Sequence, residues 1–140
     1  MIGVVLVSHA NIAKEMLDVI QHIVGPQDKI KAISIFPEDN MEKKRLEILD
    51  SVKKVDSGKG VIVLTDMFGG TPSNLAISVM ENEKIEVVAG VNLPLLIKMM
   101  SIRKKKSIKE LIKISQESGR KYINVASAFF EEKNTWNKKK

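Results

Sequence analysis

Five apolar stretches recur along the chain, and amphipathic stretches separate them. Residues 2–7 read IGVVLV and residues 61–64 read VIVL, so neither run contains a polar side chain. Continuous apolar runs of about four to eight residues are typical of strands buried on both faces of a parallel sheet. Mixed apolar stretches at residues 29–35, 85–89 and 122–126 predict three further strands.

Between these runs, apolar residues recur at spacings of three and four, which is the pattern of an amphipathic helix. Residues 12–23 show this pattern most clearly, with Asn11 placed to cap the helix and Gly25 placed to end it. Further helices are predicted over residues 41–55, 71–80, 95–102 and 108–118.

The later helices also carry terminal signals. Asp39 or Asn40 is placed to cap the helix over residues 41–55. Thr71 stands at a cap position before Pro72, a residue that suits the first turn of a helix. Gly119 is expected to end the last predicted helix.

The alternation of strands and helices indicates an α/β fold, with an open, mainly parallel sheet and helices on both faces. The 140 residues suit one domain, which we place at residues 1–128, followed by a flexible basic tail at residues 129–140. No apolar run approaches the roughly 20 residues of a membrane helix, and the N-terminal stretch lacks the positive charge of a signal peptide. A cytoplasmic protein is therefore expected.

The net charge of +6 is unevenly distributed. Residues 1–97 carry 10 basic and 13 acidic side chains, whereas residues 98–140 carry 13 basic and 4 acidic ones. The excess is concentrated in the runs Arg103 to Lys106 and Lys138 to Lys140. Only 4% of the residues are aromatic, which disfavours a base-stacking surface, so no nucleic-acid partner is expected. We interpret the basic runs as a solvated loop and a frayed tail, the alternative being a weak electrostatic docking patch.

Reactive side chains follow two of the buried runs, since Ser8 and His9 end the first and Thr65 and Asp66 end the third. In open α/β sheets, ligands bind beyond the carboxyl ends of the strands, at a switch point in strand order. If the two strands are neighbours, His9 and Asp66 meet there. A carboxylate bonded to one imidazole nitrogen leaves the other nitrogen free as a nucleophile.

A glycine-rich turn follows Asp66. Its glycines and Pro72 are explained by a tight turn that begins a helix. The same turn is a candidate anion site, because exposed backbone N–H groups and a helix N-terminus attract phosphate. The candidate phosphate-binding residues are Thr65, Gly69, Gly70, Thr71 and Ser73.

Other chemistries lack the residues that they require. The chain has no cysteine, and its second histidine, His22, lies on the polar face of a predicted helix, so neither a metal site nor a cofactor is expected. Neither glycine-rich nucleotide-binding motif occurs. A receiver-type domain would need acidic Mg²⁺ ligands after the first strand, where this chain has Ser8 and His9. Phosphate is therefore expected on the imidazole of His9 rather than on the carboxylate of Asp66.

Three segments together resemble the IIA component of mannose-family sugar phosphotransferase systems (PTS): residues 2–9 (IGVVLVSH), 65–74 (TDMFGGTPSN) and 89–96 (AGVNLPLL). The resemblance implies that the chain accepts a phosphoryl group from the carrier HPr and passes it to the IIB component. IIB phosphorylates the sugar while the membrane components IIC and IID move it. The resemblance also implies that His9 accepts the phosphoryl group on Nε2 and that Asp66 holds Nδ1.

The same resemblance implies a sheet of four parallel strands plus an antiparallel C-terminal strand, which is exchanged between the subunits of a homodimer. Residues 122–126 occupy the place of that strand. The basic run from Arg103 to Lys106 has no role in the family's chemistry. Since HPr presents a basic face, we expect this run to lie away from His9. We also expect IIB to be a separate polypeptide.

Two other functions stay open at this point. The phosphotransfer subunit of a dihydroxyacetone kinase resembles the same fold, although the FGGTP segment at residues 68–72 favours the sugar system. A non-enzymatic module that binds nucleic acid or a membrane surface through residues 98–140 is the more distant alternative, and its binding would weaken steeply with salt. The sequence does not indicate which sugar is transported.

Overall fold

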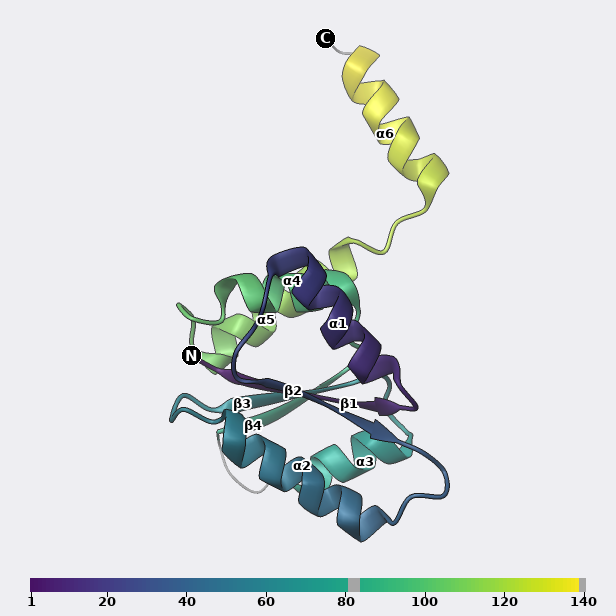
Figure 1. Ribbon diagram of the computed structural model, residues 1–140. Helices are drawn as coiled ribbons and strands as arrows, with labels where there is room; N and C mark the ends of the chain where they lie inside the picture. Colours follow the sequence, from purple (N-terminus) through teal and green to yellow (C-terminus); the bar gives the residue numbers. More distant parts are fainter. Residues whose placement is uncertain (81–83, 139–140) are drawn as a thin grey trace.

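The computed structural model describes residues 1–80 and 84–138 and contains a four-stranded sheet (Figure 1). The strands are β1 (Gly3–His9), β2 (Ile30–Ile35), β3 (Val61–Thr65) and β4 (Ile85–Ala89). They run parallel in the order β2-β1-β3-β4. This order places β1 and β3 side by side in the centre and confirms the parallel α/β fold predicted from the apolar runs.

Helices cover both faces of the sheet (Figure 1). On one face lie α1 (Ile12–Val24), α4 (Leu93–Ile102) and α5 (Ile108–Lys121), and on the other lie α2 (Met41–Val55) and α3 (Thr71–Ser78). No helix among residues 1–80 and 84–138 is long and apolar enough to cross a membrane.

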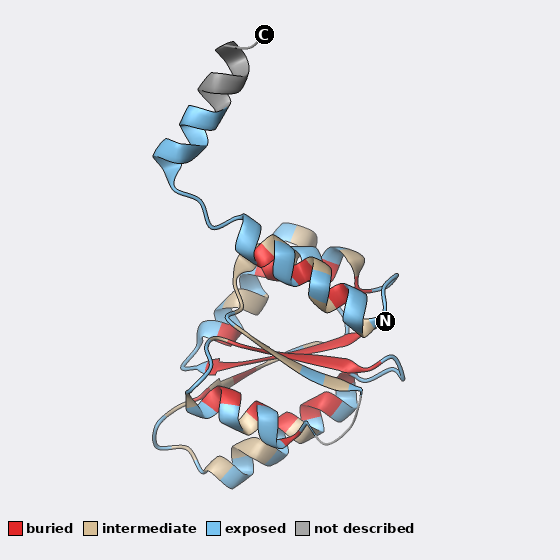
Figure 2. Cartoon of the chain, turned by 180° about the vertical axis from the view of Figure 1, so that it is seen from behind, coloured by how far each residue is buried: buried red, intermediate tan, exposed pale blue. Residues whose placement is uncertain are grey.

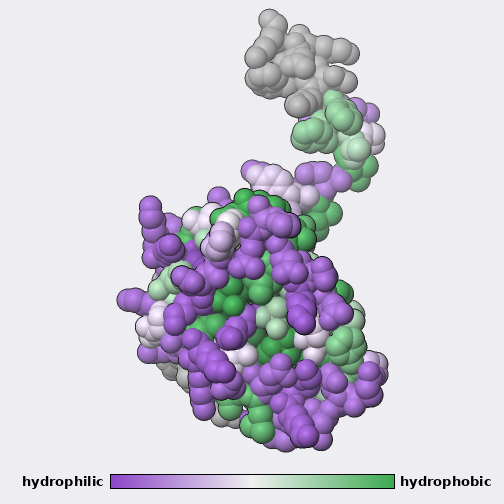
Figure 3. Space-filling model, viewed as in Figure 1, coloured by the Kyte–Doolittle hydropathy of each residue, from purple (hydrophilic) through white to green (hydrophobic). Residues whose placement is uncertain are grey.

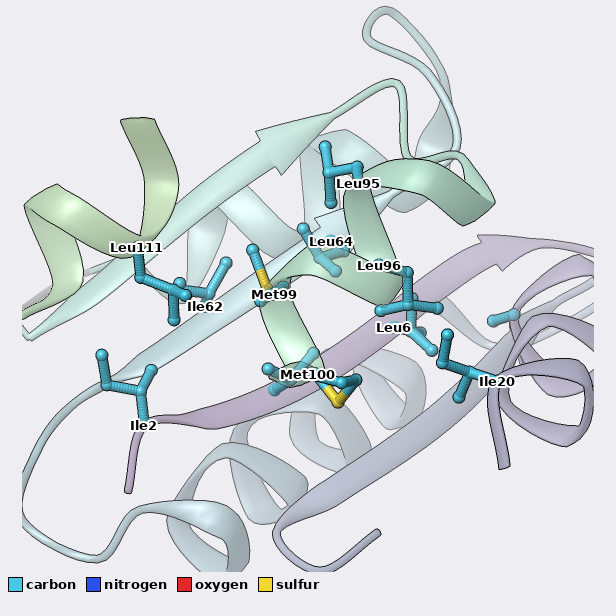
Figure 4. Packing of buried hydrophobic residues seen from close by; sticks show 12 residues of the cluster. Ile2, Leu6, Ile20, Ile62, Leu64, Leu95, Leu96, Met99, Met100 and Leu111 are labelled. Atoms are coloured by element: carbon cyan, nitrogen blue, oxygen red, sulfur yellow. The ribbon is translucent and has the colours of Figure 1, made fainter. Parts of the chain in front are cut away.

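The central strands divide the core into two clusters, because successive side chains of a strand point to opposite faces. Val4 and Leu6 of β1 pack with α1, α4 and α5, while Val5 and Val7 pack with α2 and α3. Figure 2 shows the buried residues concentrated in the strands and on the inward sides of the helices. In Figure 4, Leu96 of α4 lies over Leu6. Each such fully buried side chain stabilises the fold by about 1.5–3 kcal/mol relative to exposure.

The helix caps follow the sequence in part. Asn40 caps α2 as predicted, since its side chain accepts the backbone N–H of Lys43 at 2.9 Å. Asn11 holds the N-cap position of α1 as predicted, but its side chain makes no cap hydrogen bond. The hydroxyl of Ser8 instead accepts the N–H of Ala13 at 2.7 Å. Thr71, the predicted cap, is already the first residue of α3, and the N-cap is Gly70, one position earlier.

Gly119 does not end α5, which continues to Lys121. Its role is close helix packing, because a Cβ atom at this position would lie 3.1 Å from Cβ of Leu95 on α4. The backbone carbonyl of Gly119 also accepts a hydrogen bond from the side-chain amide of Asn92 at 2.9 Å. Gly119 therefore marks a contact between α4 and α5 rather than a helix terminus.

The C-terminal part departs from the prediction. No strand forms at residues 122–126 within the described chain: Tyr122 is a turn residue, the next three residues are irregular, and α6 (Ala126–Lys138) follows. The helix α6 stands away from the rest of the domain (Figure 1). A strand needs a ladder partner for its backbone groups, and the described part of a single chain pairs none with residues 122–126.

The basic run is only partly a solvated loop. Lys104, Lys105 and Lys106 are exposed, but Arg103 is 1% exposed. Its guanidinium donates to the backbone carbonyls of residues around the starts of β1 and β2, among them Lys29 at 3.0 Å. These carbonyls lie at the amino ends of the strands, whereas His9 lies at a carboxyl end, so the run is remote from His9 as expected.

Candidate functional site

The strand order brings together the ends of β1 and β3. Val7 of β1 lies opposite Thr65, the last residue of β3, so Asp66 follows β3 at the edge where β1 ends with His9. There, Nδ1 of His9 lies 2.7 Å from Oδ2 of Asp66. The two residues singled out from the sequence are therefore in direct contact.

Asp66 is held in its charged form by hydrogen bonds. Oδ2 also accepts the backbone N–H of His9 at 3.0 Å, and Oδ1 accepts the N–H of Met67 at 3.0 Å. Burial of the carboxyl acts to raise its pKa, but these hydrogen bonds and the charge of the His9 ring outweigh it, so the pKa of Asp66 lies below its ordinary value. Asp66 is thus an acceptor-only group at neutral pH.

This contact sets the protonation pattern of the imidazole. A carboxylate can only accept, so Nδ1 of His9 carries the proton that is shared with Asp66. In the neutral ring, Nε2 then has a free lone pair. The side chain of His9 as a whole is 46% exposed. The pair is arranged as a nucleophile with a fixed orienting group.

Gly70 forms one wall of the site. A Cβ atom at this position would lie 2.6 Å from Cε1 and 2.9 Å from Nε2 of His9, closer than real Cβ contacts come. Only glycine therefore allows the backbone to pass this near the nucleophilic side of the ring. The neighbouring Gly69 has φ of +87°, which favours glycine for a different reason, its left-handed backbone.

The turn that carries His9 contains two features that the sequence interpretation missed. Ala10 has φ of +47°, a left-handed conformation that costs a non-glycine residue about 1–2 kcal/mol. The N–H of Ala10 bonds to the carbonyl of Ile35 at 2.9 Å, and the buried hydroxyl of Ser8 bonds into α1. The signal in the sequence was a short hydroxyl residue between a strand and a helix start, a usual place for local capping.

The candidate phosphate-binding residues fall into two groups. Gly69 and Thr71 are exposed and Gly70 is half-buried, all next to His9 or in the adjoining turn. Thr65 and Ser73 are fully buried. The hydroxyl of Ser73 donates to the carbonyl of Gly70 at 3.0 Å, so it supports the turn from below rather than facing solvent.

Large apolar side chains close to the site residues in the chain are exposed. Met67 and Phe68 follow Asp66 directly and are 56% and 62% exposed, and Ile12 at the start of α1 is 44% exposed. Exposed apolar side chains gathered around a reactive group are typical of a surface that binds another protein. His22 is exposed on α1 and takes no part in this site.

Comparisons with known proteins give a consistent family. A family model described as "PTS system fructose IIA component" matches residues 3–116. The mannose-specific EIIAB component of the PTS of Escherichia coli K12 is 32% identical over 129 residues, 91% of this chain. The fructose-specific EIIA component of Bacillus subtilis is 27% identical over 98% of this chain and 94% of its own length. The chain spans only 40% of the length of the E. coli relative.

Solved structures agree with these matches. The crystal structure of a phosphotransferase system component EIIA from Streptococcus agalactiae superposes with a TM-score of 0.83 at 26% identity, covering 91% of this chain and 99% of that one. The mannose/sorbose-specific IIA subunit from Enterococcus faecalis gives a TM-score of 0.78 at 27% identity, with 89% and 93% coverage.

Proposed function

Because the chain belongs to the EIIA-man family of PTS IIA components, we propose that it is a phosphocarrier that accepts a phosphoryl group on His9 and delivers it to a IIB component. The observation that carries the proposal is the 2.7 Å contact between Nδ1 of His9 and Asp66, which leaves Nε2 free at an exposed edge of the sheet. The donor is HPr, and the transfer serves uptake of a sugar by the membrane components IIC and IID.

The proposed transfer is a single in-line displacement. The lone pair on Nε2 of His9 attacks the phosphorus atom of the donor's phosphohistidine while the phosphorus–nitrogen bond of the donor breaks. The electron pair of that bond returns to the donor ring. The proton on Nδ1 of His9 stays with its hydrogen bond to Asp66, which stabilises the positive charge that develops on the ring. Transfer to IIB is the same step in reverse, so the chemistry depends on positioning and charge.

The turn after Asp66 would receive the phosphoryl oxygens. Gly70 lies against the Nε2 side of the His9 ring, and Gly69 and Thr71 border it at the surface. Backbone N–H groups here and the N-terminus of α3 favour negative charge. We assign Thr65 and Ser73 an indirect role, because both are buried and the Ser73 hydroxyl already bonds to Gly70.

We further propose a homodimer in which residues 122–126 are exchanged as an antiparallel strand. Ile123 and Val125 are 76% and 68% exposed, although β-branched residues favour a paired strand. The outer edge of β4 has no strand partner among the described residues. Beside it lies a groove of about 420 Å³, lined by β4, α5 and Phe68. Ile123→Asp should therefore shift the protein from dimer to monomer in sedimentation analysis, and an unchanged dimer would contradict the exchange.

We propose that the protein acts in the cytoplasm. The dihydroxyacetone kinase alternative is not favoured, because the relatives named above belong to sugar systems.

The test of His9 as the phosphoryl acceptor is incubation with phosphoenolpyruvate, enzyme I and HPr. We expect an acid-labile phosphate on the wild-type chain and none on His9→Ala, with His22→Ala as the matched control that is labelled normally. Labelling that survives His9→Ala would refute the assignment.

A further inference from the structure

The pole of the domain opposite His9 contains a cavity of about 510 Å³. It lies where β1 and β3 begin, since Ile2 and Lys59 line it. The remaining basic side chains of its wall are Arg103, Lys104, Lys105 and Lys106, and no carboxylate is among its described lining residues. Figure 3 shows hydrophilic side chains projecting on the side where Figure 1 marks the N-terminus. We propose that this cavity binds the phosphate group of an anionic ligand.

Arg103 supplies the first argument. It is 1% exposed, and its two terminal nitrogens donate to four oxygen atoms: the carbonyls of Ile2, Asp28 and Lys29 and the side-chain oxygen of Gln27. Its Nε–H, however, is buried without an acceptor in the described structure. A buried donor left unpaired costs about 1–3 kcal/mol, and such groups in native proteins often mark a bound ion or water.

The charge of Arg103 is also incompletely balanced. No carboxylate lies within ion-pair distance of it in the described parts of the chain. Burial lowers the pKa of its guanidinium, and the charge of Asp28 acts in the opposite direction. Arginine nevertheless remains charged in proteins. A buried cation with only carbonyl partners favours an anion nearby.

The neighbouring lysines give the cavity its preference for multiple negative charges. Lys59, Lys104, Lys105 and Lys106 are exposed, so each can turn toward a ligand. Only Lys106 has a described carboxylate near it, Glu110 at 4.0 Å, and exposed pairs of this kind are weak. Ser107 also lines the cavity and caps α5, and its hydroxyl donates to the carboxylate of Glu110 at 2.9 Å. Several cations around one cavity suit a phosphate group better than a single carboxylate.

A titration with inorganic pyrophosphate tests the site on the full chain. The Nε–H of Arg103 and the amide of Ser107 give NMR signals at the cavity, while the amide of Gly70 reports separately on the His9 site. We expect saturable shifts at Arg103 and Ser107. Replacing Lys104, Lys105 and Lys106 by Gln should weaken binding about 10-fold or more, since each removes an exposed attraction.

The matched control replaces Lys98, Lys109 and Lys113 by Gln. These lysines are exposed and do not line the cavity, so the substitutions remove the same charge elsewhere. It should change the affinity less than about 2-fold.

Sedimentation with phosphatidylcholine vesicles, with and without phosphatidylglycerol, distinguishes a lipid headgroup from a free phosphate compound. The site is supported if the Lys104–Lys106 variant loses binding to pyrophosphate or to the anionic vesicles and the control variant retains that binding. Shifts confined to Gly70, equal losses in both variants, or no binding in either arm would overturn it. We expect His9→Ala to bind the probe at this cavity as the wild type does. Failure of the phosphate-binding proposal can therefore be distinguished from failure of the phosphocarrier proposal.

Discussion

One oxygen atom of Asp66 accepts two hydrogen bonds from His9: Oδ2 lies 3.0 Å from the backbone nitrogen and 2.7 Å from Nδ1 of the ring. Because both donors belong to one residue, the bonds fix the side chain relative to its own backbone. The ring therefore has a defined tautomer and a defined direction before any partner binds. This preorganisation is the basis of the phosphocarrier proposal.

Replacing Asp66 by Asn should slow phosphoryl transfer by about 100-fold, a usual effect of disrupting a positioned acid–base group. The amide can present its NH₂ group to Nδ1, which favours the ring form that carries its proton on Nε2 and has no nucleophilic lone pair there. Rapid-quench labelling from phospho-HPr measures the rate. Glu38→Gln, an exposed carboxylate in the loop after β2, is the control. A wild-type rate in Asp66→Asn would show that Asp66 does not orient the ring.

The two glycines of the turn should respond differently to alanine. Gly70 has an ordinary backbone, with φ of −105°, but a Cβ there would overlap the His9 ring. Gly70→Ala should therefore slow transfer by about 100-fold, since a displacement of about 1 Å is enough for such a loss. Gly69 has open space around it but φ of +87°.

Gly69→Ala should therefore lower the free energy of unfolding by about 1–2 kcal/mol while changing the transfer rate much less than Gly70→Ala. Urea unfolding and labelling together separate the two effects. Equal transfer rates in the two variants would mean that the close approach of Gly70 to His9 has no functional role.

The lowered pKa of Asp66 predicts a pH dependence of stability. A carboxyl whose pKa is lower in the folded than in the unfolded state stabilises the fold above its unfolded pKa, and this contribution is lost as the pH falls through the folded pKa. The destabilisation caused by Asp66→Asn should thus be constant from about pH 5 to 7 and shrink below about pH 4. Urea unfolding at pH 7, 5 and 3 measures it. If the destabilisation caused by Asp66→Asn grew toward acid pH, the result would contradict this account.

Arg103→Met should destabilise the fold by about 2–4 kcal/mol, because it leaves buried carbonyl oxygens at the starts of β1 and β2 without their donor. Lys104→Met changes the same charge at an exposed position and should stay within about 0.5 kcal/mol of wild type. Thermal or urea unfolding gives both values. Similar losses in the free energy of unfolding for the two variants would show that Arg103 is a solvated loop residue like its lysine neighbours.

The parts of the fold that the sequence predicted are those determined by local pattern. The strands at residues 2–7 and 61–64 are recognisable because both of their faces are covered, which removes polar residues from them. His9 and Asp66 could be paired in advance because the carboxyl ends of adjacent parallel strands share one edge.

What escaped prediction depends on contacts between distant segments. Arg103 has the same local sequence signal as the lysines after it, and only the carbonyls near β1 and β2 make it a buried residue. In the sequence, Gly119 indicates the end of a helix. In the structure, the proximity of Leu95 explains why a glycine stands at this position. A strand at residues 122–126 needs a ladder partner that the described single chain does not provide.

The most direct test of the central claim is the position of the phosphate on the imidazole. After phosphorylation by HPr, ³¹P and ¹⁵N NMR of the labelled ring distinguish the two nitrogens of His9. Since Asp66 occupies Nδ1 at 2.7 Å and Nε2 is free, we predict a single phosphohistidine with its phosphorus bonded to Nε2 of His9. Phosphate on Nδ1, or on any other residue, would contradict the account.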